Sequence, residues 1–204
     1  AYVIFGIFGF IIISVFVPKL TVEQLTREKA NTLYSEATLI ADRYGSGLYT
    51  SDTSLESVKN QLDALSVYLD SDIWIINPSG RMVLTTEYPL NVDEVVIIEN
   101  FDPTLTANSY YNVSNFFNYY DEAMLNVIAP ITTNYKVNGY VVIHASMASV
   151  YESSNSLLTI SYITMCILFF LSMIILIFFT EIVYKPLRKI TYLSLIHISE
   201  PTRH

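Results

Sequence analysis

Two long apolar segments frame the chain. Residues 1–17, AYVIFGIFGFIIISVFV, carry no charged side chain, and 28 consecutive uncharged positions separate Glu152 from Glu181. A helix of 28 residues is about 42 Å long, which exceeds the roughly 30 Å hydrocarbon core of a bilayer. The pattern predicts transmembrane helices at residues 1–17 and 157–183. Seventeen residues reach only about 25 Å, and the chain does not begin with Met, so we interpret the first helix as truncated at its start. A cleaved signal peptide, the alternative, would need a basic leader and a small-residue cleavage site, and neither is visible.

A long helix is predicted to follow the first span. Pro18 marks the exit from the membrane, where a helix bends or restarts. Thr21 and Gln24 have the spacing of a capping box, which indicates a helix start. Apolar residues then recur at helical intervals as far as about Tyr44. These residues are Ala30, Leu33, Ala37, Ile40 and Ala41.

A second, shorter helix is predicted beyond Gly45 and Gly47, the two glycines expected to end the first one. It begins near Thr53, which Glu56 would complete as a capping box. One face of it carries four apolar residues, Val58, Leu62, Leu65 and Leu69.

The apolar pattern then changes to that of β-strands. Residues 73–76 (IWII) and 82–86 (MVLTT) are rich in strand formers, and residues 77–80 (NPSG) between them suit a tight turn. These segments predict a β-hairpin. Residues 95–98 predict a third, short strand.

The last strands are predicted near the second span. Residues 126–131 (NVIAPI) and 139–145 (GYVVIHA) read as strands joined by the polar loop TTNYKVN, and residues 101–120 read as irregular and aromatic. From Ser146 the chain is expected to be helical into the second span. The predicted class is therefore α+β: a long helix, a shorter helix, an antiparallel sheet and an exit helix.

Charge predicts how the chain lies in the membrane. Lys185, Arg188 and Lys189 follow the second span closely, against the single acid Glu181. Positive residues beside a span favour the cytoplasmic side. We therefore expect both termini inside the cell and residues 18–156 outside it, in a cell membrane crossed twice.

The expected outer segment is strongly acidic. It holds 7 Lys or Arg against 17 Asp or Glu, a net charge of −10. Such a surface repels nucleic acid and anionic lipid and attracts cations, although a plain solvated exterior has the same composition. The one cysteine, Cys166, lies in the second span, so the outer segment has no disulfide and depends on its core.

Two resemblances follow from these segments. The order of helices and strands, with NPSG, NVIAPI and GYVVIH between two spans, resembles the Cache-type (PAS-like) extracellular sensor of bacterial sensor histidine kinases. Residues 184–191, YKPLRKIT, resemble the start of a HAMP linker, which we place at residues 184–192. In this comparison Pro186 and Leu187 would transmit the signal. The resemblance also implies a homodimer, an extracellular ligand of unknown identity, and a kinase domain beyond this segment that uses ATP and Mg²⁺ to signal to a response regulator.

His197 invites a different reading, as the phosphoacceptor of a kinase. If residues 184–192 begin a HAMP unit, which spans roughly fifty residues, the phosphoacceptor must lie much further along. Residues 194–204 show no sustained helical stripe, and Pro201 would interrupt one. The string LSLIHISEPTR resembles translated sequencing adapter. We therefore expect natural sequence to end near Tyr192 and residues 193–204 to be an artefact.

No catalytic or metal-binding constellation is visible, and no catalytic residue is predicted. His144 and Tyr140 share one face of their predicted strand, opposite Val141 and Ile143, so they are candidates to line a ligand site. The alternative is a structural histidine beside solvent. Tyr110 and Tyr111 open an aromatic segment that is either a binding wall or a lid over the core.

Two acidic pairs are weaker candidates for a divalent cation. Asp70 with Asp72, and Asp121 with Glu122, supply the oxygen ligands that such ions prefer. Scattered acids on an acidic surface are the simpler interpretation, and no metal site is predicted.

The sequence thus predicts a membrane receptor, the sensing half of a two-component sensor histidine kinase. The same sensor layout also occurs in chemotaxis receptors and cyclic-dinucleotide enzymes. A two-span scaffold protein without signalling is the third hypothesis. No nucleic-acid partner is expected, and the membrane contact is with lipid.

Overall fold

The computed structural model describes residues 2–45, 47, 54–89, 95–106 and 110–198. Backbone contacts divide the chain into two units. The apolar unit is Ala1–Val17 with Asn155–His204, and the sheet unit is Pro18–Ser154.

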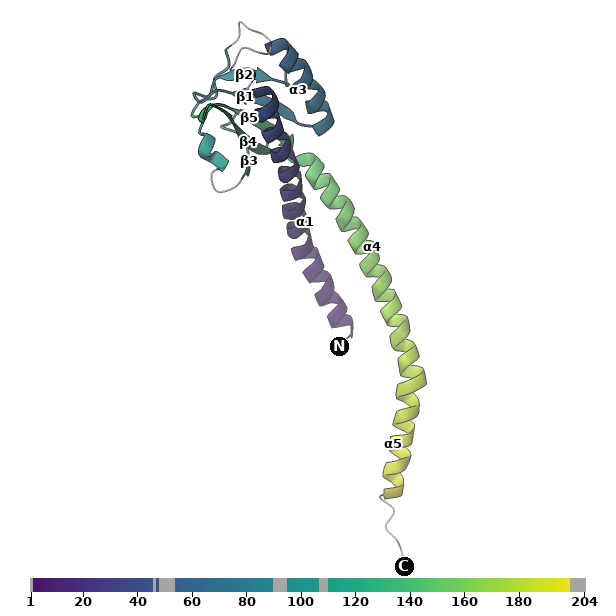
Figure 1. The fold of residues 1–204 in the computed structure, drawn as a ribbon. Helices are drawn as coiled ribbons and strands as arrows, with labels where there is room; N and C mark the ends of the chain where they lie inside the picture. The colour runs from purple at the N-terminus through teal and green to yellow at the C-terminus, as the bar shows by residue number, and fades with distance from the viewer. Residues whose placement is uncertain (1, 46, 48–53, 90–94, 107–109, 199–204) are drawn as a thin grey trace, which may run out of the picture. The chain divides into compact units, whose positions relative to one another are not determined.

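A five-stranded antiparallel sheet forms the centre of the sheet unit. Its strands are β1 (Asp72–Ile76), β2 (Met82–Thr85), β3 (Tyr111–Ser114), β4 (Met124–Thr133) and β5 (Lys136–Ser146), in the spatial order β2-β1-β5-β4-β3. The long strands β4 and β5 lie at the middle (Figure 1). Together with the long helices, this sheet confirms the predicted α+β class.

Helices cover one face of this sheet. Helix α1 (Tyr2–Ile40) continues into a π-helical turn, Ala41–Gly45, and α3 is Leu55–Leu69. Both contribute to one core with the sheet, and Figure 1 shows α1 and α3 beside the strands. The fully buried members from the helices include Ala30, Leu33, Ala37, Ile40, Val58 and Leu62, which are the stripes read from the sequence.

The opposite face carries a second, aromatic-rich core. Because side chains alternate along a strand, Trp74 and Val142 point away from the helices while Ile73, Val141 and Ile143 point toward them. The buried members of the second core are Trp74, Ile76, Ile98, Phe116, Ile128 and Val142. Segments between β2 and β4 therefore cover this face.

Helix boundaries differ from the expected ones at two places. Pro18 lies inside α1, so the start predicted at Thr21 is wrong. An interior proline costs about 3 kcal/mol, which the packing of the following turns against the sheet offsets. Helix α3 is capped by Ser54, whose hydroxyl accepts a hydrogen bond from the backbone N–H of Ser57 at 3.3 Å. Thr53, the predicted start, lies outside the described residues.

The strands also differ from expectation. The predicted strand at residues 95–98 is a single bridge, Arg81 to Ile97, flanked by backbone hydrogen bonds. Residues 101–120 are more regular than predicted: they contain a 3-10 turn, Pro103–Thr106, and the edge strand β3. Strand β3, YNVS, was missed because only one side chain in four is aliphatic and none is fully buried.

The loop expected between the last two strands is mostly strand. β4 reaches Thr133 and β5 begins at Lys136, so the connection is the two-residue turn Asn134–Tyr135. Both turn residues have positive φ, 52° and 62°. Such a turn matches the twist of a hairpin. Because residues 132–138 are largely polar, the end of β4 and the start of β5 were predicted as loop.

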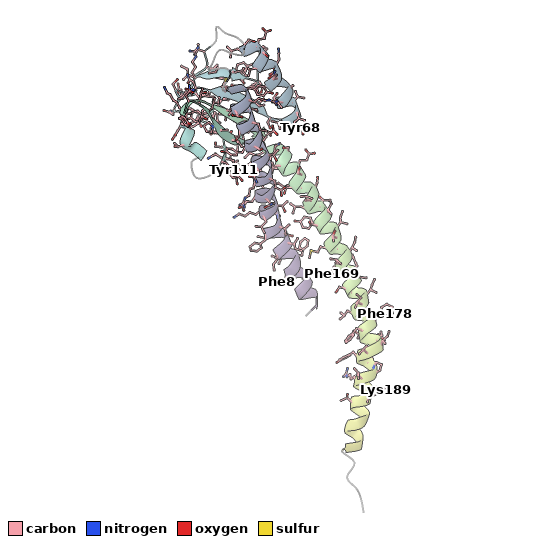
Figure 2. All side chains as sticks on the ribbon, in the orientation of Figure 1. Phe8, Tyr68, Tyr111, Phe169, Phe178 and Lys189 are labelled. Carbon is pink, nitrogen blue, oxygen red and sulfur yellow. The ribbon has the colours of Figure 1, made fainter. Side chains whose placement is uncertain are left out.

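The apolar unit is helical throughout its described part. After the first turns of α1 come α4 (Met147–Phe179), a π-helical turn (Thr180–Tyr184) and α5 (Lys185–Ile198). Two helical stretches, Gly6–Tyr44 and Met147–Thr191, are long and apolar enough to cross a membrane, since each contains an 18-residue window of high mean hydropathy, 1.8 and 2.7. Phe8 and Phe178 are largely exposed on their helices, whereas Phe169 of α4 lies against Gly6 of α1 (Figure 2). Helix α5 runs past Tyr192 although no helical stripe was read from Ser194 onward.

Candidate ligand-binding site

His144 lies near the end of the central strand β5, on the sheet face opposite the helices. It is fully buried on β5, and its Nδ1 is 2.7 Å from the side-chain oxygen of Asn126 on β4. The Asn126 amide nitrogen donates to the carbonyl oxygens of Ser114 and Met124, at 3.0 and 3.1 Å. These bonds turn the amide oxygen toward the histidine, so Nδ1–H donates and Nε2 carries the free lone pair.

Aromatic rings enclose this histidine. The ring centroids of Trp74 and Phe116 each lie 4.4 Å from the centroid of the His144 ring, and the ring centroid of Tyr120 lies 5.2 Å from it. Tyr119 meets Trp74 edge-on at 4.6 Å. We call Trp74, Phe116, Tyr119 and Tyr120 the aromatic box. Burial among these rings lowers the pKa of His144 to about 3, so the imidazole is neutral at pH 7.

Three buried polar atoms of this face have no hydrogen-bond partner in the described part of the chain. They are Trp74 Nε1, His144 Nε2 and the hydroxyl of Tyr120. One is a donor, one an acceptor, and the third can be either. Leaving a buried polar group unpaired costs about 1–3 kcal/mol, so each such group requires an explanation.

Carboxylates adjoin the box. Asp72 stands opposite His144 in the β1–β5 register and shares the face of Trp74. Partial burial, and then the charge of Asp70, raise the pKa of Asp72. The Tyr119 hydroxyl donates to Glu87 Oε2 at 3.2 Å. Partial desolvation raises the pKa of Glu87, which this hydrogen bond opposes and the charge of Asp72 reinforces.

The segment that supplies the box has an unusual backbone. Phe116, Phe117 and Asn118 all have positive φ, 42°, 54° and 62°. Residues other than glycine rarely adopt a positive φ, because the side chain then crowds the backbone. Such conformations concentrate at functional sites. The segment is held by backbone bonds from Tyr119 to Phe116 and from Tyr120 to Asn115, both 3.1 Å.

The four residues predicted to line a ligand site divide between the two faces. His144 and half-buried Tyr140 lie on the face opposite the helices, where the ring centroids of Tyr140 and Phe101 are 5.8 Å apart. Tyr110 and Tyr111 pack against the core on the helix side, where the ring centroids of Tyr110 and Tyr34 of α1 are 5.6 Å apart. The alternative interpretation was a structural histidine beside solvent; its solvent-facing position is wrong, because His144 is fully buried, and the structural role stays a prediction.

The remaining predicted residues lie elsewhere. Asp70 ends α3 in a left-handed conformation, and Asp121 and Glu122 are exposed. Within the described ranges, no three His, Cys, Asp or Glu side chains converge as a metal site. Pro186 and Leu187 lie in the first turn of α5, where both are exposed.

Two partners of His144 had no predicted role in the site: Trp74 and Asn126 were assigned only to strands. Phe116 and Tyr120 lie within the aromatic segment opened by Tyr110, which was predicted to be either a binding wall or a lid, but neither was proposed as a ligand-binding residue. The available signal was the two-residue period of a strand. Trp74 lies on the same face of β1 as Asp72, and His144 lies on the same face of β5 as Tyr140. Which strands are neighbours, and hence which of these residues meet, depends on the order β1-β5-β4.

A separate hollow lies on the helix side of the sheet unit. It has a volume of about 550 Å³ and is lined by residues of α1, α3 and the start of α4. Its two charged groups have partners: Lys29 donates to the Ser149 hydroxyl at 2.8 Å, and Glu28 accepts from the Gln24 side chain at 3.0 Å. The unpaired polar atoms described above distinguish the aromatic face from this hollow.

Comparisons with known proteins give limited similarities. No protein-family model and no curated protein matches the chain. The sensor domain of the V. cholerae histidine kinase DctB is 14% identical, with a TM-score of 0.45 over 67% of this chain and 57% of that one. The ligand-binding domain of the Campylobacter jejuni chemoreceptor Tlp3, solved with L-valine, is 12% identical, with a TM-score of 0.46 over 66% and 60%. The chain thus spans less than two thirds of either structure, and neither assigns it an activity or a ligand.

Proposed function

We propose that this chain is the sensing and membrane-spanning part of a signalling receptor of the sensor histidine kinase type. One observation supports this most directly: His144, which carries one of the unpaired polar atoms of the aromatic face, belongs to the strand that leads into the second candidate span. His144 precedes Met147, the first residue of α4, by three positions. A molecule bound at the aromatic face would therefore act on β5 immediately before the helix.

Helix α1 offers a second connection. The same helix that holds the apolar residues 6–17 buries Leu33, Ala37 and Ile40 in the core of the sheet unit. A shift between β5 and α1 would become a piston, tilt or rotation of the second span. A ligand biases two such states only as far as it binds one better than the other.

The proposal includes an orientation and an output. Residues 18–156 face the outside of the cell, and both ends of the chain face the cytoplasm, because Lys185, Arg188 and Lys189 follow the second span. Pro186 and Leu187 pass the motion to a HAMP linker. The receptor is a homodimer whose kinase domain uses ATP and Mg²⁺ and phosphorylates a response regulator.

Two alternatives share parts of this proposal. A chemotaxis receptor or a cyclic-dinucleotide enzyme would use the same sensor and a different output. A two-span scaffold would need neither the unpaired buried atoms nor helices that continue from the core into both candidate spans.

A test that needs no ligand joins residues 1–191 to the HAMP and kinase portion of a sensor kinase with a known reporter. One to four alanines are inserted after Tyr184, at the start of α5. Signalling through a helix predicts reporter activity that alternates with the 3.6-residue period, because each insertion rotates the output by about 100°. The matched control places the same insertions in the exposed turn at Tyr135. Equal activity for all four insertions after Tyr184 would favour the scaffold.

A further inference from the structure

Among the described residues, no ion pair joins a basic side chain to the carboxylates beside the aromatic box. All seven Lys and Arg residues between Pro18 and Ser154 lie in the described part of the chain. Ion pairs described there include Arg27–Glu23 and Lys59–Asp63, and neither involves Asp72 or Glu87. A half-buried carboxylate without a cation is unfavourable, and here a second carboxylate lies close to it.

Buried, unpaired atoms point to a ligand at the same place. The bond from His144 Nδ1 to Asn126 lies toward β4, so Nε2 lies on the β1 side, where Asp72 and Trp74 are. Neutral Nε2 is a hydrogen-bond acceptor, and the Tyr120 hydroxyl can also accept. Among the described residues at this face, the unpaired donors are Trp74 Nε1 and the Tyr120 hydroxyl, whereas His144 Nε2, the same hydroxyl and the two carboxylates accept, so acceptors outnumber donors.

The rings favour an organic cation over a metal ion. The electron-rich faces of Trp and Tyr attract ammonium groups, by about 0.5–2 kcal/mol according to the degree of desolvation. Hard metal ions instead need six or more oxygen ligands or bound waters. A wall built largely from Trp74, Phe116 and Tyr120 does not supply them.

We propose that this face binds a small organic cation, a protonated amine, held by Asp72 and Glu87 and lying against the rings of Trp74 and Tyr120. The inference rests on the proposed sensing role and adds the chemical class of the ligand. Ammonium N–H groups donate to the two carboxylates and to His144 Nε2. Residues 18–156 carry a net charge of −10, which attracts such a cation from solution.

Trp74 is the one tryptophan of the chain, so its fluorescence reports on this site alone. The full chain in detergent micelles is titrated with butylammonium, butanol and butyrate at pH 7.5 and constant ionic strength. We expect a saturable change with butylammonium only. Asp72→Asn and Glu87→Gln should each weaken binding at least tenfold, while Glu122→Gln, an exposed acid outside the site, should leave it unchanged. Glu87 is exposed, so its variant tests the site even if Asp72→Asn impairs folding.

Each other outcome overturns the amine assignment. Saturation by butanol or butyrate, or by Mg²⁺ or Ca²⁺ in place of the amine, would show a site of another class and leave the sensing role intact. An unchanged spectrum with butylammonium up to 50 mM, on the order of the weakest specific binding, would reject the class directly. The insertion series after Tyr184 tests the signalling role separately, because it requires no ligand.

Discussion

At the scale of single residues, Asn126 determines the state of His144. Its amide is fixed by bonds to Ser114 and Met124, so it presents an oxygen to the imidazole and selects one tautomer. Among the described groups near the ring, Asp72 and Glu87 are acidic and Tyr119 and Tyr120 are neutral at pH 7. The histidine is therefore a neutral acceptor beside acids.

The buried histidine predicts a pH dependence of stability. Its pKa of about 3 in the fold lies below the ordinary value of about 6.5 in the unfolded chain, which therefore binds more protons between these values. The full stabilisation is present above about pH 6.5 and decreases as the pH falls, by about 1 kcal/mol per unit. Urea unfolding followed by Trp74 fluorescence at pH 7 and pH 5 measures this loss.

The variant His144→Phe provides the comparison, because it keeps an aromatic ring and removes the titration. The pKa values of Asp72 and Glu87 are raised, so these groups change stability in the opposite direction, favouring the fold as the pH falls. They are present in both proteins and cancel in the difference. Equal losses of stability in the two proteins would contradict a buried neutral histidine.

At the scale of elements, the β1–β2 hairpin depends on one glycine. Gly80 has a φ of +83°, and a Cβ there would lie 2.8 Å from the carbonyl oxygen of Ile98. The Asn77 side chain also organises the turn, accepting from the backbone N–H groups of Ser79 and Arg81 at 3.0 and 2.9 Å. The turn thereby fixes β2 and the chain that follows it beside the aromatic face.

We expect Gly80→Ala to reduce the free energy of unfolding by about 1–3 kcal/mol, from backbone strain and the contact with Ile98. Ser79→Ala is the matched control in the same turn. It loses one exposed hydrogen bond to Asn77, 2.8 Å long, and should cost about 1 kcal/mol or less. A smaller loss for Gly80→Ala than for Ser79→Ala in urea unfolding would show that the turn relaxes without strain.

At the scale of the whole molecule, two kinds of surface coexist. The apolar unit exposes large side chains such as Phe170 and Ile177, at 64% and 55%, whereas the sheet unit buries its aliphatic residues in two cores. Exposed apolar surface of this extent is stable in lipid and unfavourable in water. The composition of each unit therefore suits a different solvent.

Cysteine labelling tests the proposed orientation in intact cells. In a Cys166→Ser background, Tyr135→Cys places a thiol on the β4–β5 turn, where Tyr135 is fully exposed. A membrane-impermeant maleimide should label it, while Arg188→Cys should react only after the cells are permeabilised. The reverse pattern would place residues 18–156 inside the cell.

The sequence alone determined the features that depend on local pattern. The uncharged segments at residues 1–17 and between Glu152 and Glu181 predict apolar helices from their composition alone. The spacing of Leu33, Ala37 and Ile40 predicts the buried stripe of α1. Alternation along residues 139–145 likewise separated His144 and Tyr140 from Val141 and Ile143. Each follows from the geometry of one helix or one strand, without reference to a partner.

Only the tertiary structure decided what depends on distant partners. Strand order brought Asn126, Trp74 and Tyr120 to His144, and the same order placed Tyr110 and Tyr111 on the opposite side. The edge strand β3 and the bridge at Ile97 exist because neighbouring strands offer hydrogen-bonding groups, a condition that short sequence windows do not contain. The candidate site is built from such long-range contacts, and this is why the sequence indicated His144 and Tyr140 but not the residues that surround the histidine.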